Sequence, residues 1–195
     1  EPTTITHRRG QTRFLEPVGV EEPSTVTRAG RAAAKLCKLA FDLAKAADLP
    51  GMADLALGGL LESTQTDAAA LLLLPRDYTG EPTAEALEII ASRSATEQRY
   101  HRVSNSLAGT VMREGEAVLA RNVLGDSTLG SRDSKGEIHT ASVICAPVRH
   151  GRKILGIMHL YSTVGERVPD PDDLEFTLAV AETVAVALEN LQKRQ

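Results

Sequence analysis

The sequence predicts an α+β fold with a central antiparallel sheet of about five to six strands. Three observations lead to this prediction. Long segments with helical periodicity lie near both ends of the chain, at residues 24–48 and 171–191. Short apolar segments lie between them, and the last two form a tight hairpin around His150 and Gly151. We expect the terminal helices to cover one face of the sheet, and a short helix and loops to cover the other.

Two shorter helices are predicted from residues that suit helix ends. A helix over roughly residues 50–64 follows Asp48, which can cap it, and has Pro50 in its first turn. A short helix begins after Ser104 and stops at Gly115, because serine caps an N-terminus and glycine ends a helix readily.

The last predicted helix, residues 171–191, is apolar on two sides. Glu175, Glu182 and Glu189 repeat every seventh position on what we expect to be its outer line. One apolar side can cover the sheet, but the other needs a partner helix. The sequence therefore predicts a homodimer formed through the first and last helices.

The strands are expected at four places in the middle of the chain. They are the segments "DAAALLLLP", "LEIIASR" and "AVLARNV" and the hairpin over residues 142–162. A two-residue loop at the hairpin tip would place Cys145 opposite Gly156, and Ser142 opposite His159. Cys145 and His159 would then face opposite sides of the sheet, which argues against a cysteine nucleophile with a histidine base. One bulge would reverse that facing.

Composition excludes several classes of function. The net charge is −4, and the chain has three Phe, three Tyr and no Trp, so neither a basic field nor stacking platforms favour direct nucleic-acid contact. Cys37 and Cys145 are the two cysteines, without a CxxC motif, which is typical of a reduced cytoplasmic protein. The apolar run Ala68–Leu74 is too short to span a bilayer, so no membrane contact is expected.

Two segments are predicted to lie outside the regular structure. Residues 1–23 contain three prolines and are interpreted as an extended linker from an upstream domain, with one folded domain over residues 24–195. Residues 125–138 are rich in Gly and Ser and are expected to be the most mobile part of that domain.

The chain resembles a GAF domain over about residues 28–192. The resemblance rests on the order and spacing of several short motifs: Ser106-Leu107-Ala108-Gly109, Arg121-Asn122-Val123 with Asp126, Ser142 through Pro147, Leu155-Gly156-Ile157, and "DDLEFTLAVAETVAVALEN" at the end. It implies a sensory or regulatory module of a bacterial signalling protein, usually dimeric. Its small-molecule pocket would lie between one sheet face and the helix and loops before the hairpin, and its terminal helices would act on a neighbouring output domain.

Seven residues are candidates for binding a small ligand, which the sequence does not identify: Arg121, Asn122, Asp126, His139, Ser142, His159 and Tyr161. The first four enter or lie in the long loop, and the others belong to the hairpin. His159 is equally compatible with a core histidine whose polar atoms are satisfied. No cofactor is predicted, and the histidine spacing does not favour a metal.

Two other functions remain open. The family's free methionine sulfoxide reductases resemble this fold but normally use three cysteines, whereas Cys37 and Cys145 lie on separate predicted elements. The third class is a dimerisation scaffold without a ligand. We expect a module without catalytic activity.

Overall fold

The computed structural model describes residues 5–11, 23–121, 141–163 and 167–194. Its helices are α1 (Pro23–Lys45), α2 (Leu49–Ser63), the 3-10 turn η2 (Ala84–Ala86), α3 (Asn105–Glu114) and α4 (Pro171–Lys193). Its strands are β1 (Ile5–Arg9), β2 (Ala68–Leu73), β3 (Glu88–Ser94), β4 (Ala117–Arg121), β5 (Ser142–His150) and β6 (Lys153–Ser162).

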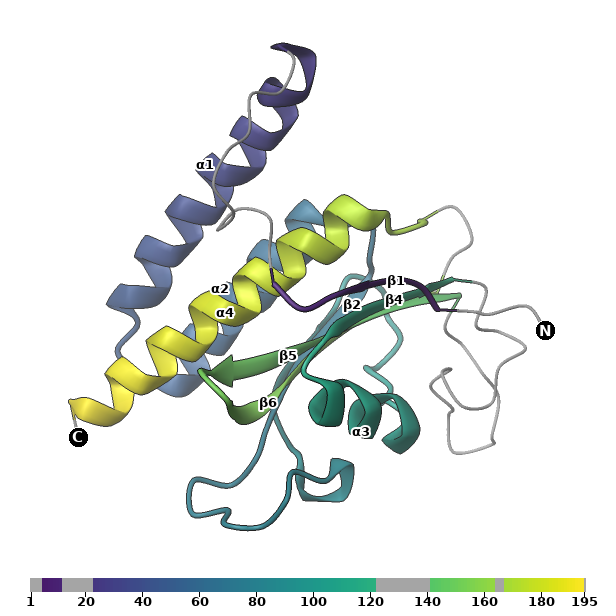
Figure 1. Ribbon diagram of the computed structural model, residues 1–195. Coiled ribbons are helices and arrows are strands. Elements are labelled where there is room, and N and C mark those ends of the chain that lie inside the picture. The colour runs from purple at the N-terminus through teal and green to yellow at the C-terminus, as the bar shows by residue number, and fades with distance from the viewer. Residues whose placement is uncertain (1–4, 12–22, 122–140, 164–166, 195) are drawn as a thin grey trace.

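The six strands form one sheet in the order β1-β4-β5-β6-β2-β3, and all neighbouring strands are antiparallel. Helices α1, α2 and α4 lie on one face, and α3 lies on the other (Figure 1). The predicted α+β fold is therefore confirmed. We call the two sides of the sheet the helical face and the α3 face.

Each face of the sheet has its own core, because successive side chains of a strand point to opposite sides. On β5, Ile144 and Ala146 pack with Leu178 and Val184 of α4 on the helical face. Between them, Cys145 belongs to the core on the α3 face. The central strands are buried on both sides, which explains their nearly continuous apolar sequence.

The two shorter helices, α2 and α3, have the caps that the sequence predicts, whereas α1 ends at Lys45 instead of residue 48 and α4 continues to Lys193. The Asp48 side chain accepts a hydrogen bond from the Gly51 N–H at 2.8 Å and caps α2. The Ser104 hydroxyl accepts from the Leu107 N–H at 3.2 Å and caps α3, which ends at Gly115 with a φ of 67°. These bonds satisfy N–H groups that have no partner inside the helix.

Strand β1 lies within the segment that the sequence analysis assigns to an extended linker. It is an edge strand paired with β4, and Arg9 Nε lies 2.7 Å from Glu175 Oε1 of α4. Arg149 Nη2 donates to the Gly10 carbonyl at 2.6 Å. Four of the five β1 residues are exposed, so no apolar alternation marks the strand in the sequence. Glu175 is only 3% exposed, so the prediction of an outward acidic line on α4 is wrong at this position.

The register of the β5–β6 hairpin differs from the predicted one. His150 pairs with Lys153 around Gly151, whose φ is 60°, and a bulge follows between Val148 and Arg149. Moving the turn by one residue does not change which side chains of β5 and β6 share a face of the sheet. The bulge does change it, because it adds one residue to one strand.

The bulge brings together residues that the sequence analysis placed on opposite faces. Cys145 pairs with His159 instead of Gly156, and Ser142 pairs with Ser162 instead of His159. Cys145 and His159 therefore share one side of the sheet.

We predict that Gly156→Ala destabilises the fold by about 1–3 kcal/mol. A Cβ at Gly156 would overlap the Leu72 carbonyl oxygen and lie 2.8 Å from Leu73 Cα, both in the backbone of β2. Urea denaturation should show the loss. Gly109→Ala in α3 is the matched control, because its Cβ meets open space and alanine favours a helix by about 1 kcal/mol over glycine. Equal stability of Gly156→Ala and wild type would contradict this packing.

Candidate functional site

The seven predicted ligand residues do not all lie together. His159 and Tyr161 alternate with Met158 and Leu160 on β6 and lie on the α3 face. Asn122, Asp126 and His139 lie outside the described residues, as does the segment 125–138.

Ser142 and Arg121 lie on the helical face. Ser142 alternates with Cys145 and Val143, is 4% exposed and pairs with Ser162. Arg121 Nε donates to the Pro169 carbonyl at 3.0 Å, just before α4 begins. The prediction that both share a pocket with His159 is therefore wrong for these two residues, because the bulge and the strand alternation turn them to the opposite face.

Three aromatic rings form the most polar part of the α3-face core. We call Tyr100, His159 and Tyr161 the aromatic cluster. The Tyr100 hydroxyl lies 2.7 Å from His159 Nδ1, and its ring is stacked on Tyr161 with centroids 5.8 Å apart. The Tyr161 hydroxyl in turn accepts a hydrogen bond from the His101 N–H at 2.8 Å. Two tyrosines and a histidine thus fix the segment between β3 and α3 to the sheet.

All three rings of the cluster are neutral near pH 7. Burial lowers the pKa of His159 to about 3 and raises the pKa of Tyr161 to about 12. Burial also raises the pKa of Tyr100 far above its usual value. Desolvation disfavours the charged form in each case.

His159 has one polar partner and one ring nitrogen without a partner. Its Nδ1 shares a hydrogen bond with the Tyr100 hydroxyl, and the tautomer of the neutral imidazole decides which of the two groups donates. Among the described residues, Nε2 has no hydrogen-bond partner although His159 is fully buried. A buried polar atom without a partner costs about 1–3 kcal/mol, and a polar ligand group bound to Nε2 would recover that cost.

Cys145 lies beside the cluster without the features of a nucleophile. It pairs with His159 across the strands, but no hydrogen bond joins its thiol to the imidazole in the described structure. It is fully buried, and burial raises the pKa of its thiol. Cys37 is exposed on α1, far along the chain and on the helical side of the sheet. A thiolate is the reactive form of cysteine, and this environment disfavours it.

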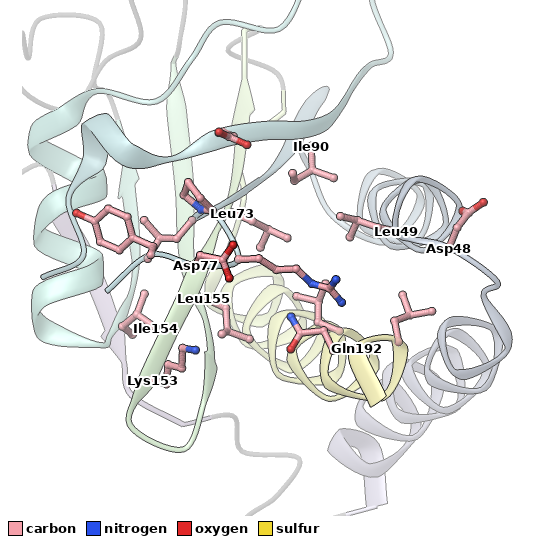
Figure 2. A pocket seen from close by; sticks show the side chains of 16 residues that line it. Asp48, Leu49, Leu73, Asp77, Ile90, Lys153, Ile154, Leu155 and Gln192 are labelled. Carbon is pink, nitrogen blue, oxygen red and sulfur yellow. The ribbon is translucent and has the colours of Figure 1, made fainter. Parts of the chain in front are cut away.

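A separate groove lies where β2 ends and β6 begins, beside the C-terminal turns of α4 (Figure 2). Its volume is about 870 Å³, within the size range of small-molecule pockets. Leu49, Leu73 and Leu155 contribute apolar side chains to its lining, and Asp77 and Lys153 contribute charged ones. His159 does not line it.

Sequence reasoning missed both the groove and Tyr100. The groove is lined by residues from α2, β2, β3, β6 and α4, so no local pattern marks it. Tyr100 could have been noticed in the sequence. The chain has only six Phe and Tyr residues together, and Tyr100 follows the polar segment 95–99, which is exposed in the structure. An aromatic residue at the end of such a segment often packs back on the protein.

The described ranges contain neither a metal-binding cluster nor a helix that could span a membrane. No group of three or more His, Cys, Asp or Glu side chains in these ranges is arranged to hold a metal ion. None of the helices described here combines the length and the apolar character needed to cross a bilayer.

Comparison with known proteins identifies the family. The family model of the GAF domain matches residues 46–189, and the chain belongs to this family. No curated protein matches the chain. β1 and all of α1 lie before the matched residues.

Solved structures show the same fold at low sequence identity. The GAF domain of a phosphoenolpyruvate-protein phosphotransferase from Coxiella burnetii has a TM-score of 0.65 and 16% identity, over 85% of this chain and 97% of that one. The GAF domain of a putative sensor histidine kinase from Pseudomonas syringae pv. tomato has a TM-score of 0.58 and 14% identity, over 88% and 94%. Free methionine-R-sulfoxide reductase from Neisseria meningitidis has a TM-score of 0.65 and 12% identity, over 92% and 98%.

We predict that the burial of His159 makes the fold acid-sensitive. Its pKa is about 3 in the folded state and about 6.5 when unfolded, so its contribution is complete above pH 6.5 and is lost as the pH falls toward 3. Between pH 6.5 and 4.5 wild type should lose about 2–3 kcal/mol relative to His159→Leu, which cannot titrate there. Urea denaturation across that pH range measures the free energy of unfolding of both proteins. Parallel curves of this free energy against pH would contradict a buried neutral imidazole.

Proposed function

We propose that this chain is a non-catalytic sensory and regulatory module of a cytoplasmic bacterial signalling protein. It binds a small ligand on the α3 face and acts on a neighbouring output domain through its terminal helices. The observation that carries the proposal is the aromatic cluster, in which the buried His159 Nε2 has no partner among the described residues. Membership of the GAF family and its sensor-domain neighbours support the regulatory class.

Strand β6 supports a route from the ligand to the output helix. His159 and Tyr161 lie on its α3 face, and Met158 and Leu160 lie on its helical face in the same core as α4. A change at the imidazole that moves this strand therefore changes the packing of α4. Close-packed cores transmit such shifts because they contain little free volume.

The alternative enzymatic function is that of a thiol reductase for free methionine sulfoxide. The cross-strand pairing of Cys145 with His159 and the similar fold of the Neisseria enzyme favour it. The raised pKa of the Cys145 thiol and its complete burial support the non-catalytic proposal instead. Turnover of free methionine sulfoxide that Cys145→Ser abolishes would establish the enzyme.

The ligand is tested on protein purified without denaturation. Native mass spectrometry should detect a copurifying small molecule, and its readdition should raise the melting temperature because it binds only the folded state. His159→Leu should weaken this binding at least tenfold if one hydrogen bond is lost, since about 1.4 kcal/mol is a factor of ten. Ser142→Ala is the matched control, because Ser142 lies on the helical face. Equal binding by wild type and His159→Leu would place the ligand elsewhere, and the absence of any ligand would favour a dimerisation scaffold.

We also propose a homodimer through α1 and α4. Leu188 of α4 is only 6% exposed and is covered within its own chain, so it does not need a partner helix. Phe41 of α1 is 62% exposed and Val186 of α4 is 53% exposed, and these side chains support the proposal. Burial of each would stabilise a dimer by about 1.5–3 kcal/mol.

Light scattering over a dilution series should show a dimer that Phe41→Glu or Val186→Glu weakens. Ile89→Glu is the control, because Ile89 is an equally large apolar residue, 45% exposed, on β3 instead of a terminal helix. A wild type that stays monomeric at high protein concentration rules out this assembly.

A further inference from the structure

Tyr100 packs into the α3-face core from a surface segment. The five residues before it are exposed, and the segment from residue 95 to 104 contains no helix or strand. Its ring nevertheless lies against the sheet, stacked on Tyr161 and edge-on to His159 with centroids 5.6 Å apart. A side chain from a surface segment therefore fills a space in the α3-face core.

The polar contacts of Tyr100 are those of a phenol in a binding site. Its hydroxyl shares a hydrogen bond of 2.7 Å with His159 Nδ1, and the Val103 backbone also interacts with its oxygen. The surroundings are apolar, with Val103, Leu107 and Cys145 in the same core. Ring stacking and one hydroxyl group are thus the interactions that this space provides.

We propose that Tyr100 is a built-in occupant of a ligand site, and that a small neutral monophenol binds there by displacing it. The inference rests on the proposed function and specifies the ligand class of that site. A phenol places its ring on Tyr161 and its hydroxyl on His159 Nδ1, and the segment 95–104 moves away from the sheet. An anionic ligand is disfavoured, because the surroundings of the aromatic cluster are largely apolar and desolvation of a charge is costly.

Displacement gives the site a regulatory output. The Tyr161 hydroxyl holds the His101 N–H at 2.8 Å, so the same segment is tied to the sheet at two neighbouring residues. Release of Tyr100 loosens the connection between β3 and the start of α3. Because the Tyr100 side chain is tethered to the protein, it competes for the site at a high local concentration. It therefore lowers the affinity of the site for any added phenol.

The test uses p-cresol, which has the ring and hydroxyl of a tyrosine side chain, with toluene and 4-methylbenzoate as controls. Tyr100→Ala should bind p-cresol at least about tenfold more tightly than wild type, because the internal competitor is gone. The same variant should bind toluene about tenfold more weakly than p-cresol, since toluene cannot replace the hydrogen bond. It should bind 4-methylbenzoate more weakly still.

The His159 imidazole resonances locate the bound molecule. They should shift with p-cresol in Tyr100→Ala, and the preference for p-cresol over toluene should disappear in Tyr100→Ala/His159→Leu. Tyr78→Ala is the matched control, because Tyr78 lines the separate groove and its hydroxyl bonds the Glu81 carbonyl. This variant should bind p-cresol no better than wild type.

Tyr100→Phe keeps the ring and covers the case in which Tyr100→Ala does not fold. It lacks the internal hydrogen bond and should bind p-cresol about tenfold more tightly than wild type. Equal p-cresol affinity in wild type and in the folded Tyr100 variants would overturn the inference. A copurified ligand that His159→Leu weakens but that Tyr100→Ala binds no more tightly than wild type would also overturn it, while leaving the proposed sensory function supported.

Discussion

The pairing register of β5 and β6 is the constraint on which the rest of the structure depends. These strands lie in the middle of the sheet, so their alternation decides which side chains enter each core. The bulge between Val148 and Arg149 fixes that alternation. Without the bulge, Cys145 and His159 would face opposite sides of the sheet, and only one of them would lie on the α3 face with Tyr100. Buried polar groups without partners cost several times more than one misplaced methyl group, so the register follows the polar residues as well as the apolar ones.

The two sides of the sheet have different physical character, and this difference suits a sensory role. The helical face contains mainly aliphatic side chains from three helices and the central strands. The α3 face contains, among aliphatic residues, an aromatic cluster in which one imidazole nitrogen has no hydrogen-bond partner within the described ranges. Aliphatic packing resists rearrangement because it is dense, whereas a surface segment whose residues 95–99 are exposed opens at lower cost. A domain built this way can change on one side while its helices remain folded on the other.

A fold shared with an enzyme does not make this chain an enzyme. The Neisseria methionine sulfoxide reductase and the sensor-kinase GAF domain both resemble it, at 12% and 14% identity. Function depends on the site, and here the bulge brings a cysteine next to a histidine while burial keeps both neutral. The pKa values of Cys145 and His159 disfavour the thiolate and the imidazolium. The two side chains are therefore packed cross-strand neighbours, and the thiol is not activated. The same burial makes His159 a hydrogen-bonding group in place of a proton carrier.

Much of the fold follows from local patterns in the sequence. Helical periodicity, the caps at Asp48 and Ser104 and the apolar strands determine the elements and their layers, because these signals act within a few residues. The sequence also marks His159 and Tyr161 as candidate pocket residues. Only the tertiary structure decided the faces of Cys145, Ser142 and Arg121, the addition of β1 to the sheet, and the position of Tyr100. A bulge reverses every side chain beyond it without a distinct sequence signal, and β1 is held by backbone bonds and by Arg9 reaching a distant carboxylate. Such contacts join residues far apart in the chain, so they exist only once the fold has formed.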